Sequence, residues 1–154
     1  MATRDYTGRS VDLFVMQGAE ESGMRLISPG FSSGGGEVTT GVQKAAQMFT
    51  VLFLTEKGTV AHDPEYGTNF LATARRSNAI DSMIKIAFRE AVQDILDQQS
   101  RYRQTDDPDD ELIASIELLG LASPDPTQMI LTIYITTIAG TTREVILPVT
   151  LAVK

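Results

Sequence analysis

The segment of residues 56–70, EKGTVAHDPEYGTNF, contains the only histidine of the chain, His62. Asp63 follows it directly, and Glu65 lies two residues further on. An imidazole beside two carboxylates has the residue types of a general acid–base pair, of a metal site and of a serine triad. The same residues also suit a polar loop whose role is geometric. The elements around the segment decide between these interpretations.

A hydrolase is the first chemistry to consider. A glycosidase needs two carboxyl groups about 5 to 9.5 Å apart, one of them with a raised pKa in an apolar environment. Asp63 and Glu65 are separated by Pro64 alone, and Tyr66 and Phe70 are the only nearby aromatic residues. This is weak support for a catalytic pair, so we expect the protein not to be an enzyme.

Other reactive centres have less support still. The chain has no cysteine and one histidine, whereas zinc sites usually combine several histidine or cysteine ligands. No G-x-S-x-G sequence supplies a serine nucleophile, and the glycine run SSGGGE is not followed by the Lys-Ser or Lys-Thr of a phosphate-binding loop. We therefore predict no catalytic residue, no metal and no cofactor.

The composition indicates a folded, acidic protein. Hydrophobic residues make up 42% of the 154 residues and charged residues 21%, which is typical of a globular domain. The formal net charge of −7 repels a phosphate backbone, so we expect no nucleic acid partner. No apolar run approaches the roughly 20 residues of a transmembrane helix, and the N-terminus lacks the layout of a secretory signal, so we expect a soluble protein without a membrane partner.

Residues 1–41 are expected to form an N-terminal arm, separate from a domain of residues 42–154. The apolar run VDLFVMQ at residues 11–17 favours a short strand, and MRLIS at residues 24–28 favours a second strand that pairs with it across GAEESG. After Pro29, the glycine- and serine-rich stretch from Gly30 to Gly36 is typical of a linker.

The domain opens with a predicted helix from Val42 to Thr55, where apolar residues recur at helical spacing. Thr39 or Thr40 is expected to cap its start, and Gly58 to end it. Residues 59–76 are predicted to form a loop whose course is set by turn-forming residues. Two aromatic residues, Tyr66 and Phe70, are expected to hold this loop to the domain. The loop-shaping residues are Gly58, Asp63, Pro64, Tyr66 and Gly67.

A long amphipathic helix follows, after a cap at Ser77 or Asn78. Its apolar stripe consists of Ile80, Ile84, Ala87, Phe88, Ala91, Val92 and Ile95. Arginine and tyrosine, which are typical interface anchors, flank both ends of this helix and are candidates for a docking face. The alternative is that they cap the helix and solubilise the surface. These residues are Arg75, Arg76, Arg101, Tyr102 and Arg103.

The last third of the chain predicts a three-stranded antiparallel meander. The acidic run DDPDDE at residues 106–111 is expected to be a solvated loop. Runs rich in β-branched residues start at residues 112, 129 and 143, separated by turn compositions. Pro148 cannot donate to a ladder, so the third strand is expected either at an edge of the sheet or with a bulge at Pro148. The expected fold is α+β, with two helices on one face of a small antiparallel meander sheet.

This order of elements resembles the sheath-initiator family, the small lysozyme-like baseplate wedge proteins of contractile phage tails and related contractile injection systems. The resemblance covers residues 42–154: a helix ending in LT-x-KG, then HDPEYGTNFL, then the long helix and a meander ending in ILPV. Most of it is carried by Leu54-Thr55, Lys57-Gly58 and residues 63–67. The family's usual Glu-Pro-Arg after the long helix is replaced here by QQSRYRQTDDPDDE, in which Arg101 is the nearest substitute for the arginine.

The resemblance implies a fold like the inner domain of tail sheath proteins, and a structural role in the virion, in the tail baseplate around the tube. It implies several copies, with the tail sheath protein, baseplate wedge proteins and tail tube proteins as partners. A family member initiates sheath assembly by offering a sheet edge for strand exchange with the first sheath ring, which is a form of β-augmentation. On this chain that edge falls on the last strand, and the candidate partner-binding residues there are Val145, Leu147, Val149 and Leu151.

Two alternatives stay open at the level of sequence. One is a cell-wall-degrading tail lysozyme, which would require turnover that depends on Glu65. The other is an unrelated small α+β binding domain.

Overall fold

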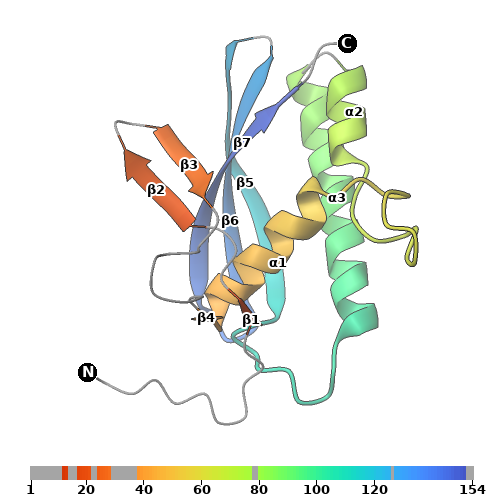
Figure 1. The fold of residues 1–154 in the computed structure, drawn as a ribbon, viewed down its shortest axis with the longest axis vertical. Coiled ribbons are helices and arrows are strands. Elements are labelled where there is room, and N and C mark those ends of the chain that lie inside the picture. Colours follow the sequence, from red (N-terminus) through yellow and green to blue (C-terminus); the bar gives the residue numbers. More distant parts are fainter. Residues whose placement is uncertain are drawn as a thin grey trace.

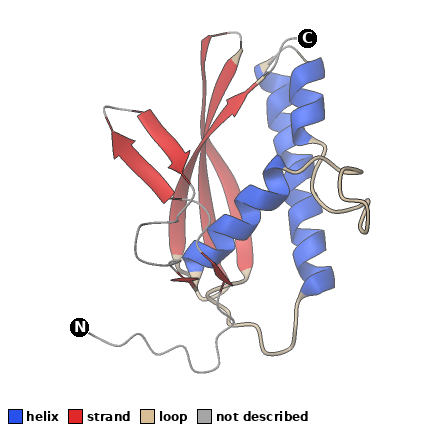
Figure 2. Cartoon of the chain, in the orientation of Figure 1, coloured by secondary structure: helices blue, strands red, loops and turns tan. Residues whose placement is uncertain are grey.

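The computed structural model describes residues 12–13, 17–21, 24–28, 38–77, 80–125 and 127–151. Within these ranges, three helices lie on one side of a three-stranded antiparallel sheet, which confirms the α+β class (Figure 1, Figure 2). None of the described helices is both long and apolar enough to cross a membrane. The helices are α1 (Val42–Leu54), α2 (Phe70–Arg76) and α3 (Asp81–Tyr102). The sheet contains β5 (Ile113–Asp125), β6 (Gln128–Thr137) and β7 (Thr142–Thr150).

The sheet is the predicted meander, in the order β5-β6-β7. Its central strand, β6, alternates between buried and more exposed residues, because one face of the sheet lies under the helices. Four residues, 138–141, connect β6 to β7, and Gly140 among them, at a φ of +78°, donates its N–H to Thr137 O at 2.9 Å. The fully buried residues of β6 are Met129, Leu131, Ile133 and Ile135.

Helix α2 contradicts the predicted loop over residues 59–76. The loop ends at Asn69, and a helix of seven residues begins at Phe70. Phe70 and Ala74 lie one helical turn apart and both are buried, and α2 packs along α3. A helix of this length has little stability of its own, so its formation depends on that packing, which a local sequence pattern does not reveal.

Aromatic side chains join the three helices. The ring of Phe53 in α1 lies 4.3 Å from the ring of Phe70 in α2 and 5.8 Å from that of Phe88 in α3, between centroids. Phe49, one turn earlier in α1, stacks on Phe53 at 5.2 Å. Phe70 is therefore an anchor of the loop that precedes it, as expected from the sequence.

The start of α1 is held by a side chain from a distant segment. The N-cap residue is Gly41, at a φ of +64°, and no side chain of the predicted capping threonines takes part. Glu111 Oε1 accepts a hydrogen bond from the Gly41 N–H at 3.3 Å, and Glu111 Oε2 lies 2.7 Å from Lys44 Nζ. The carboxylate therefore supplies the negative charge that a helix N-terminus favours.

Glu111 also corrects the prediction that the whole acidic run is solvated. Asp106 and Asp109 are exposed, but Glu111 is only 6% exposed. Burial of a carboxylate is tolerated when a cation and hydrogen-bond donors satisfy it, as Lys44 and the Gly41 N–H do here. The last residue of the acidic run is therefore a structural link between the β5 segment and α1.

The start of α3 also differs from the prediction. Ile80 is the N-cap residue and is 57% exposed, so it does not belong to the buried stripe. Ser77 lies at the end of α2, where its hydroxyl donates to the Ala74 carbonyl at 3.0 Å, and Asn78 lies outside the described residues. The buried stripe is confirmed for Ile84, Ala87, Phe88, Ala91 and Ile95.

The described residues before α1 form two small sheets. β3 (Met24–Ser28) has the predicted bounds, but its antiparallel partner β2 spans Gln17–Glu21 instead of residues 11–17. β1 (Asp12–Leu13) pairs with β4 (Val38–Thr39), which lies just before α1. The predicted linker from Gly30 to Gly36 falls outside the described residues.

Candidate functional site

Residues 55–69 form a loop that backbone hydrogen bonds close at its base. Thr68 N–H donates to Thr55 O at 2.8 Å, and Lys57 N–H donates to Thr68 O at 3.2 Å. The Thr68 hydroxyl donates to Phe53 O, in the last turns of α1, at 3.1 Å. The two ends of the loop are therefore tied to each other and to α1.

Gly58 and Pro64 shape the outer part of this loop. The Gly58 N–H donates to the Pro64 carbonyl at 2.8 Å, and the φ of Gly58 is +83°, a value that favours glycine. Helix α1 has already ended at Leu54, with Thr55 as its C-cap residue. Gly58 is therefore a turn residue within the loop and not the helix stop expected from the sequence.

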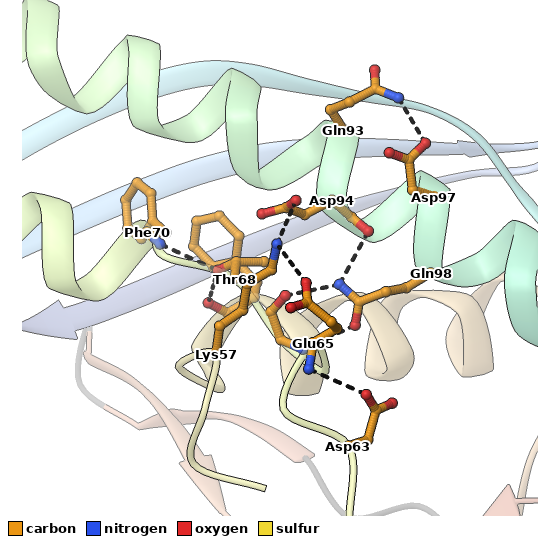
Figure 3. Close-up of polar contacts among 11 residues, drawn as sticks. Lys57, Asp63, Glu65, Thr68, Phe70, Gln93, Asp94, Asp97 and Gln98 are labelled. Carbon is orange, nitrogen blue, oxygen red and sulfur yellow. Dashed lines mark hydrogen bonds and ion pairs between the residues drawn. The ribbon is translucent and has the colours of Figure 1, made fainter.

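Gly67 is the position in the loop that excludes a side chain. Its φ is +96°, and a Cβ atom there would lie 2.3 Å from the Thr55 carbonyl oxygen. Gln98 of α3 binds both backbone groups of Gly67: Oε1 accepts from the N–H at 2.9 Å, and Nε2 donates to the carbonyl at 2.8 Å. Figure 3 shows the Gln98 amide reaching from α3 to the loop. Because Gln98 is 1% exposed, this link is buried.

Lys57 forms a second link between the loop and α3. Its Nζ lies 2.7 Å from Asp94 Oδ1 and 4.0 Å from Glu65 Oε2, so one ammonium group lies between two carboxylates (Figure 3). Lys57 and Asp94 are both partly buried, and salt screens such a pair less than a fully exposed one. The shorter contact, to Asp94, fixes the loop on α3.

Asp63 is held by Tyr102, the last residue of α3. The Tyr102 hydroxyl donates to Asp63 Oδ2, and the Glu65 N–H donates to Asp63 Oδ1 at 3.2 Å. The Tyr102 hydrogen bond is the main reason why the pKa of Asp63 lies below its usual value of 3.8, with further lowering by the Glu65 N–H and by the charges of Arg101 and His62. The same bond raises the pKa of the Tyr102 phenol above its usual 10.0.

These contacts favour a structural role for the segment. A lowered pKa is the opposite of what a general acid requires, and His62 and Glu65 are both exposed. Among the described residues, no group of three or more histidine, aspartate or glutamate side chains could hold a metal ion. Tyr66 packs against the core, as the sequence predicts, and burial raises its pKa. The segment is thus a shaped connection between α1 and α2.

The arginine and tyrosine residues predicted to form a docking face lie at opposite ends of α3. Arg75 and Arg76 belong to the last turn of α2, five residues before α3 begins, whereas Arg101 and Tyr102 close α3 and Arg103 follows. The 22 residues of α3 span about 33 Å, so the two groups do not form one patch.

Two of these five residues bond within the chain. The Arg75 guanidinium pairs with Glu56 of the loop, and Tyr102 donates to Asp63. Arg76, Arg101 and Arg103 are exposed. Arg75 and Tyr102 are exposed as well, so all five side chains are accessible to a partner, although these two are also bonded within the chain.

A groove of about 290 Å³ separates the middle of α1 from the C-terminal end of α3. Met48 and Leu52 of α1 and Tyr66 of the loop give it apolar walls, and Tyr102 and Arg103 line it on the α3 side. The groove brings two of the predicted docking residues next to the loop that carries the sequence resemblance.

The candidate partner-binding side chains of the last strand lie mainly in the core. Leu147 is fully buried, Val149 and Leu151 are each 5% exposed, and Val145 is partly buried against the core. These side chains share one face of the strand, and the helices cover that face. A partner can therefore reach this strand through its backbone, and not through these side chains.

Two hydrogen bonds determine which backbone groups of β7 point to its outer edge. Thr137 N–H donates to Thr141 O at 2.9 Å at one end of the β6–β7 pair, and Leu151 N–H donates to Thr127 O at 2.7 Å at the other end. Because bonded and non-bonded pairs alternate along an antiparallel ladder, odd-numbered residues of β7 bond to β6 and even-numbered residues face outward. The outward-facing residues are Thr142, Glu144, Ile146, Pro148 and Thr150.

The two edges of the sheet differ in regularity. β7 keeps one register with β6 over its nine residues, and among the described strands it pairs with β6 alone. β5 shifts its register against β6 at three places. At the start of β5, Gln99 of α3 binds both backbone groups of Ile113, at 2.8 and 2.9 Å. Bulges and covered backbone groups protect an edge from further pairing, so β7 is the more open edge.

Two residues that organise this structure were not predicted, Gln98 and Glu111. Gln98 continues the spacing of the buried stripe, three residues after Ile95, so a polar residue in an apolar register was the available signal. Glu111 had a weaker signal, its position directly before the apolar run that starts at Leu112.

No protein-family model matches this chain, and the comparison with curated proteins yields no match either. A functional assignment therefore rests on the sheet edge, the loop and the resemblance seen in the sequence.

Proposed function

We propose that this protein is a structural component of the baseplate of a contractile phage tail, and that it initiates sheath assembly. The outer edge of β7 receives a strand from the first sheath ring and extends the sheet. The observation that carries this proposal is the single-register edge of β7, which no other described strand covers. The resemblance of residues 42–154 to sheath initiators supports it from the sequence side.

The hydrogen bonds for this contact come from the backbone. Glu144 and Ile146 direct their N–H and C=O groups outward, and in β-augmentation such groups supply affinity. Leu147 and Val149 stay in the core while the edge is paired, so docking requires no exchange of core side chains. An edge that is already in strand geometry also avoids much of the ordering entropy of binding.

The loop of residues 55–69 contributes indirectly. Gln98 and Lys57 join it to α3, and Thr68 joins it to α1, so the helical layer that covers the sheet is cross-linked by buried and partly buried polar contacts. In the proposal this layer keeps the sheet rigid and β7 ready for pairing.

The proposal places the protein in several copies around the tail tube of the virion, with the tail sheath protein, baseplate wedge proteins and tail tube proteins as partners. Arg76, Arg101 and Arg103 are exposed and are candidates for the wedge or tube contacts. Arginine is suited to this role because its planar guanidinium binds carboxylates in a bidentate manner.

The proposal is tested by removing one outward donor from β7. Ile146→Pro deletes an N–H at the outer edge while the bonds between β7 and β6, which belong to the odd-numbered residues, remain. We expect sheath assembly on purified baseplate–tube complexes, counted as sheathed tubes in electron micrographs, to fall about tenfold, which corresponds to the loss of about one hydrogen bond.

Ser123→Pro is the matched control, because it introduces a proline at an exposed position of β5. Thermal unfolding of both variants shows whether they are folded. Normal sheath assembly with the folded Ile146→Pro variant contradicts strand exchange at β7.

A further inference from the structure

Pro148 occupies an outward position of β7, and this has a consequence for any strand that docks there. Its missing N–H does not affect the pairing with β6, because Leu147 and Val149 carry the bonds on that side. The loss falls on the outer edge, where residue 148 offers a carbonyl acceptor and no donor.

The outer edge of β7 therefore has two unequal halves. From Thr142 to Ile146 each outward residue offers both an N–H and a C=O group. At Pro148 the series of donors stops, and it resumes only at Thr150, the last residue of the strand. A docked strand can thus form a continuous ladder along the first half only.

The half of the β7 edge from Thr142 to Ile146 also carries the charged residues of the strand. Arg143 and Glu144 are exposed neighbours on opposite faces of β7, and the strand carries no charged residue from Val145 to Thr150. Opposite charges directly across from each other stabilise a strand pair, and like charges destabilise it. The complementary segment therefore presents a cation across from Glu144 and an acid across from Arg143.

We propose that the strand accepted by β7 is a short extended segment of the tail sheath subunit, that it pairs with Thr142–Ile146, and that Pro148 ends the ladder. This rests on the proposed function, since it takes the sheath subunit as the source of the strand. The segment carries a lysine or arginine across from Glu144, and an aspartate or glutamate across from Arg143.

Pro148 also limits pairing with the wrong partner. A regular strand edge invites a second copy of the same chain, and edge prolines are one of the devices by which proteins prevent this. A ladder interrupted after Ile146 is too short to stabilise such a pair by backbone bonds alone. The complementary charges then select the sheath strand.

The primary test is amide hydrogen exchange of the full-length chain with and without the purified tail sheath subunit. We expect the sheath subunit to slow exchange of the Glu144 and Ile146 amides while the Thr150 amide keeps its rate. The amides of Val145 and Leu147, which bond to β6, are protected in both samples and report that the chain is folded.

Two variants sharpen this result. Pro148→Val restores a donor, so we expect protection to extend to position 148 and to Thr150, with affinity for the sheath subunit about tenfold higher. Its matched control, Thr150→Val, keeps the backbone donor and is expected to leave affinity unchanged. Glu144→Lys is expected to weaken binding, whereas Glu117→Lys, at an exposed residue of β5, is expected to have no effect.

The possible failures are distinguishable. Protection of Thr150 in the unaltered chain, or unchanged affinity and protection in Pro148→Val, overturns the inference that Pro148 ends the ladder while strand docking at β7 stands. No protection of Glu144 and Ile146 by the sheath subunit overturns the proposed function as well.

Discussion

The loop of residues 55–69 and the outer edge of β7 use their polar groups in opposite ways. The loop contains the side-chain types from which active sites are built, yet Asp63 is bonded to Tyr102, Lys57 to Asp94, and Gly67 to Gln98. The even-numbered residues of β7 offer little side-chain chemistry, but their N–H and C=O groups pair with no other described strand. In the proposed function, unused backbone bonding capacity, and not reactive residue types, marks the surface where the partner binds.

The largest loss of stability is expected for the substitution Gly67→Ala, which adds a methyl group. In Gly67→Ala the Cβ atom meets the Thr55 carbonyl oxygen at 2.3 Å in a backbone conformation that L residues rarely adopt. We expect the free energy of unfolding to fall by about 3 kcal/mol, measured by urea denaturation.

Gly58→Ala is the control for this substitution. Gly58 also has a positive φ, +83°, but a Cβ atom there has no neighbour within 4 Å. The expected loss is about 1 kcal/mol, from the left-handed conformation alone. Equal losses in the two variants would show that the loop does not need its close approach to Thr55.

A smaller effect is expected at Gln98. Gln98→Leu removes the two hydrogen bonds to Gly67 and leaves the Gly67 N–H and C=O buried without that partner. The expected destabilisation is about 2 kcal/mol, with faster hydrogen exchange of the loop amides. Gln93→Leu, at an exposed residue of the same helix, is expected to change stability by less than about 0.5 kcal/mol. If the loop amides exchange as before in Gln98→Leu, the loop is held by other contacts.

The smallest effect is expected at the contact between Tyr102 and Asp63, and it depends on pH. The pKa of Asp63 is lower in the folded chain than its usual value of 3.8, so the contact adds stability above that value and loses it as the pH falls through the folded pKa. The pKa of Tyr102 is raised above 10.0, so its contribution is present below that value and is lost as the pH rises through the folded pKa.

The measurement is an NMR titration of the Asp63 carboxyl group. In Tyr102→Phe the pKa of Asp63 is expected to rise towards 3.8, because the hydrogen bond that mainly lowers it is gone. Tyr134→Phe, in β6, leaves this bond in place and is expected to leave the pKa unchanged. An unchanged pKa in Tyr102→Phe contradicts the contact.

Much of the sheet was predictable, because its determinants are local. Alternating apolar residues separated by turn sequences indicate a meander wherever they occur in a protein. Pro148 has no N–H to donate, so its strand must lie where that hydrogen bond to a neighbouring strand is not needed. The turn role of Gly67 was predictable for the same reason, since positive φ values favour glycine, and Gly58 shapes the loop as expected but does not end α1. Strand exchange at β7 stays a prediction.

The contacts that hold the helical layer were not predictable. Glu111 reaches Gly41 across 70 residues, and Gln98 reaches Gly67 across 31. A local pattern reports the propensity of a segment, and it does not report which distant backbone group a polar side chain will meet. Helix α2 was not predicted for a related reason, since its stability comes from packing on α3.

By itself, the sequence determined the α+β class, the three-strand meander, the long helix and the edge position of β7, because periodicity and proline act through neighbouring residues. Only the tertiary structure decided that Lys57, Asp63 and Gly67 of the loop are bonded to α3, that the Leu147 and Val149 side chains of β7 are covered, and that the backbone of Pro148 faces outward. Each of these depends either on which residues of a strand form the hydrogen bonds to its neighbour or on which distant group a side chain contacts. Both are determined only when segments far apart in the chain pack together.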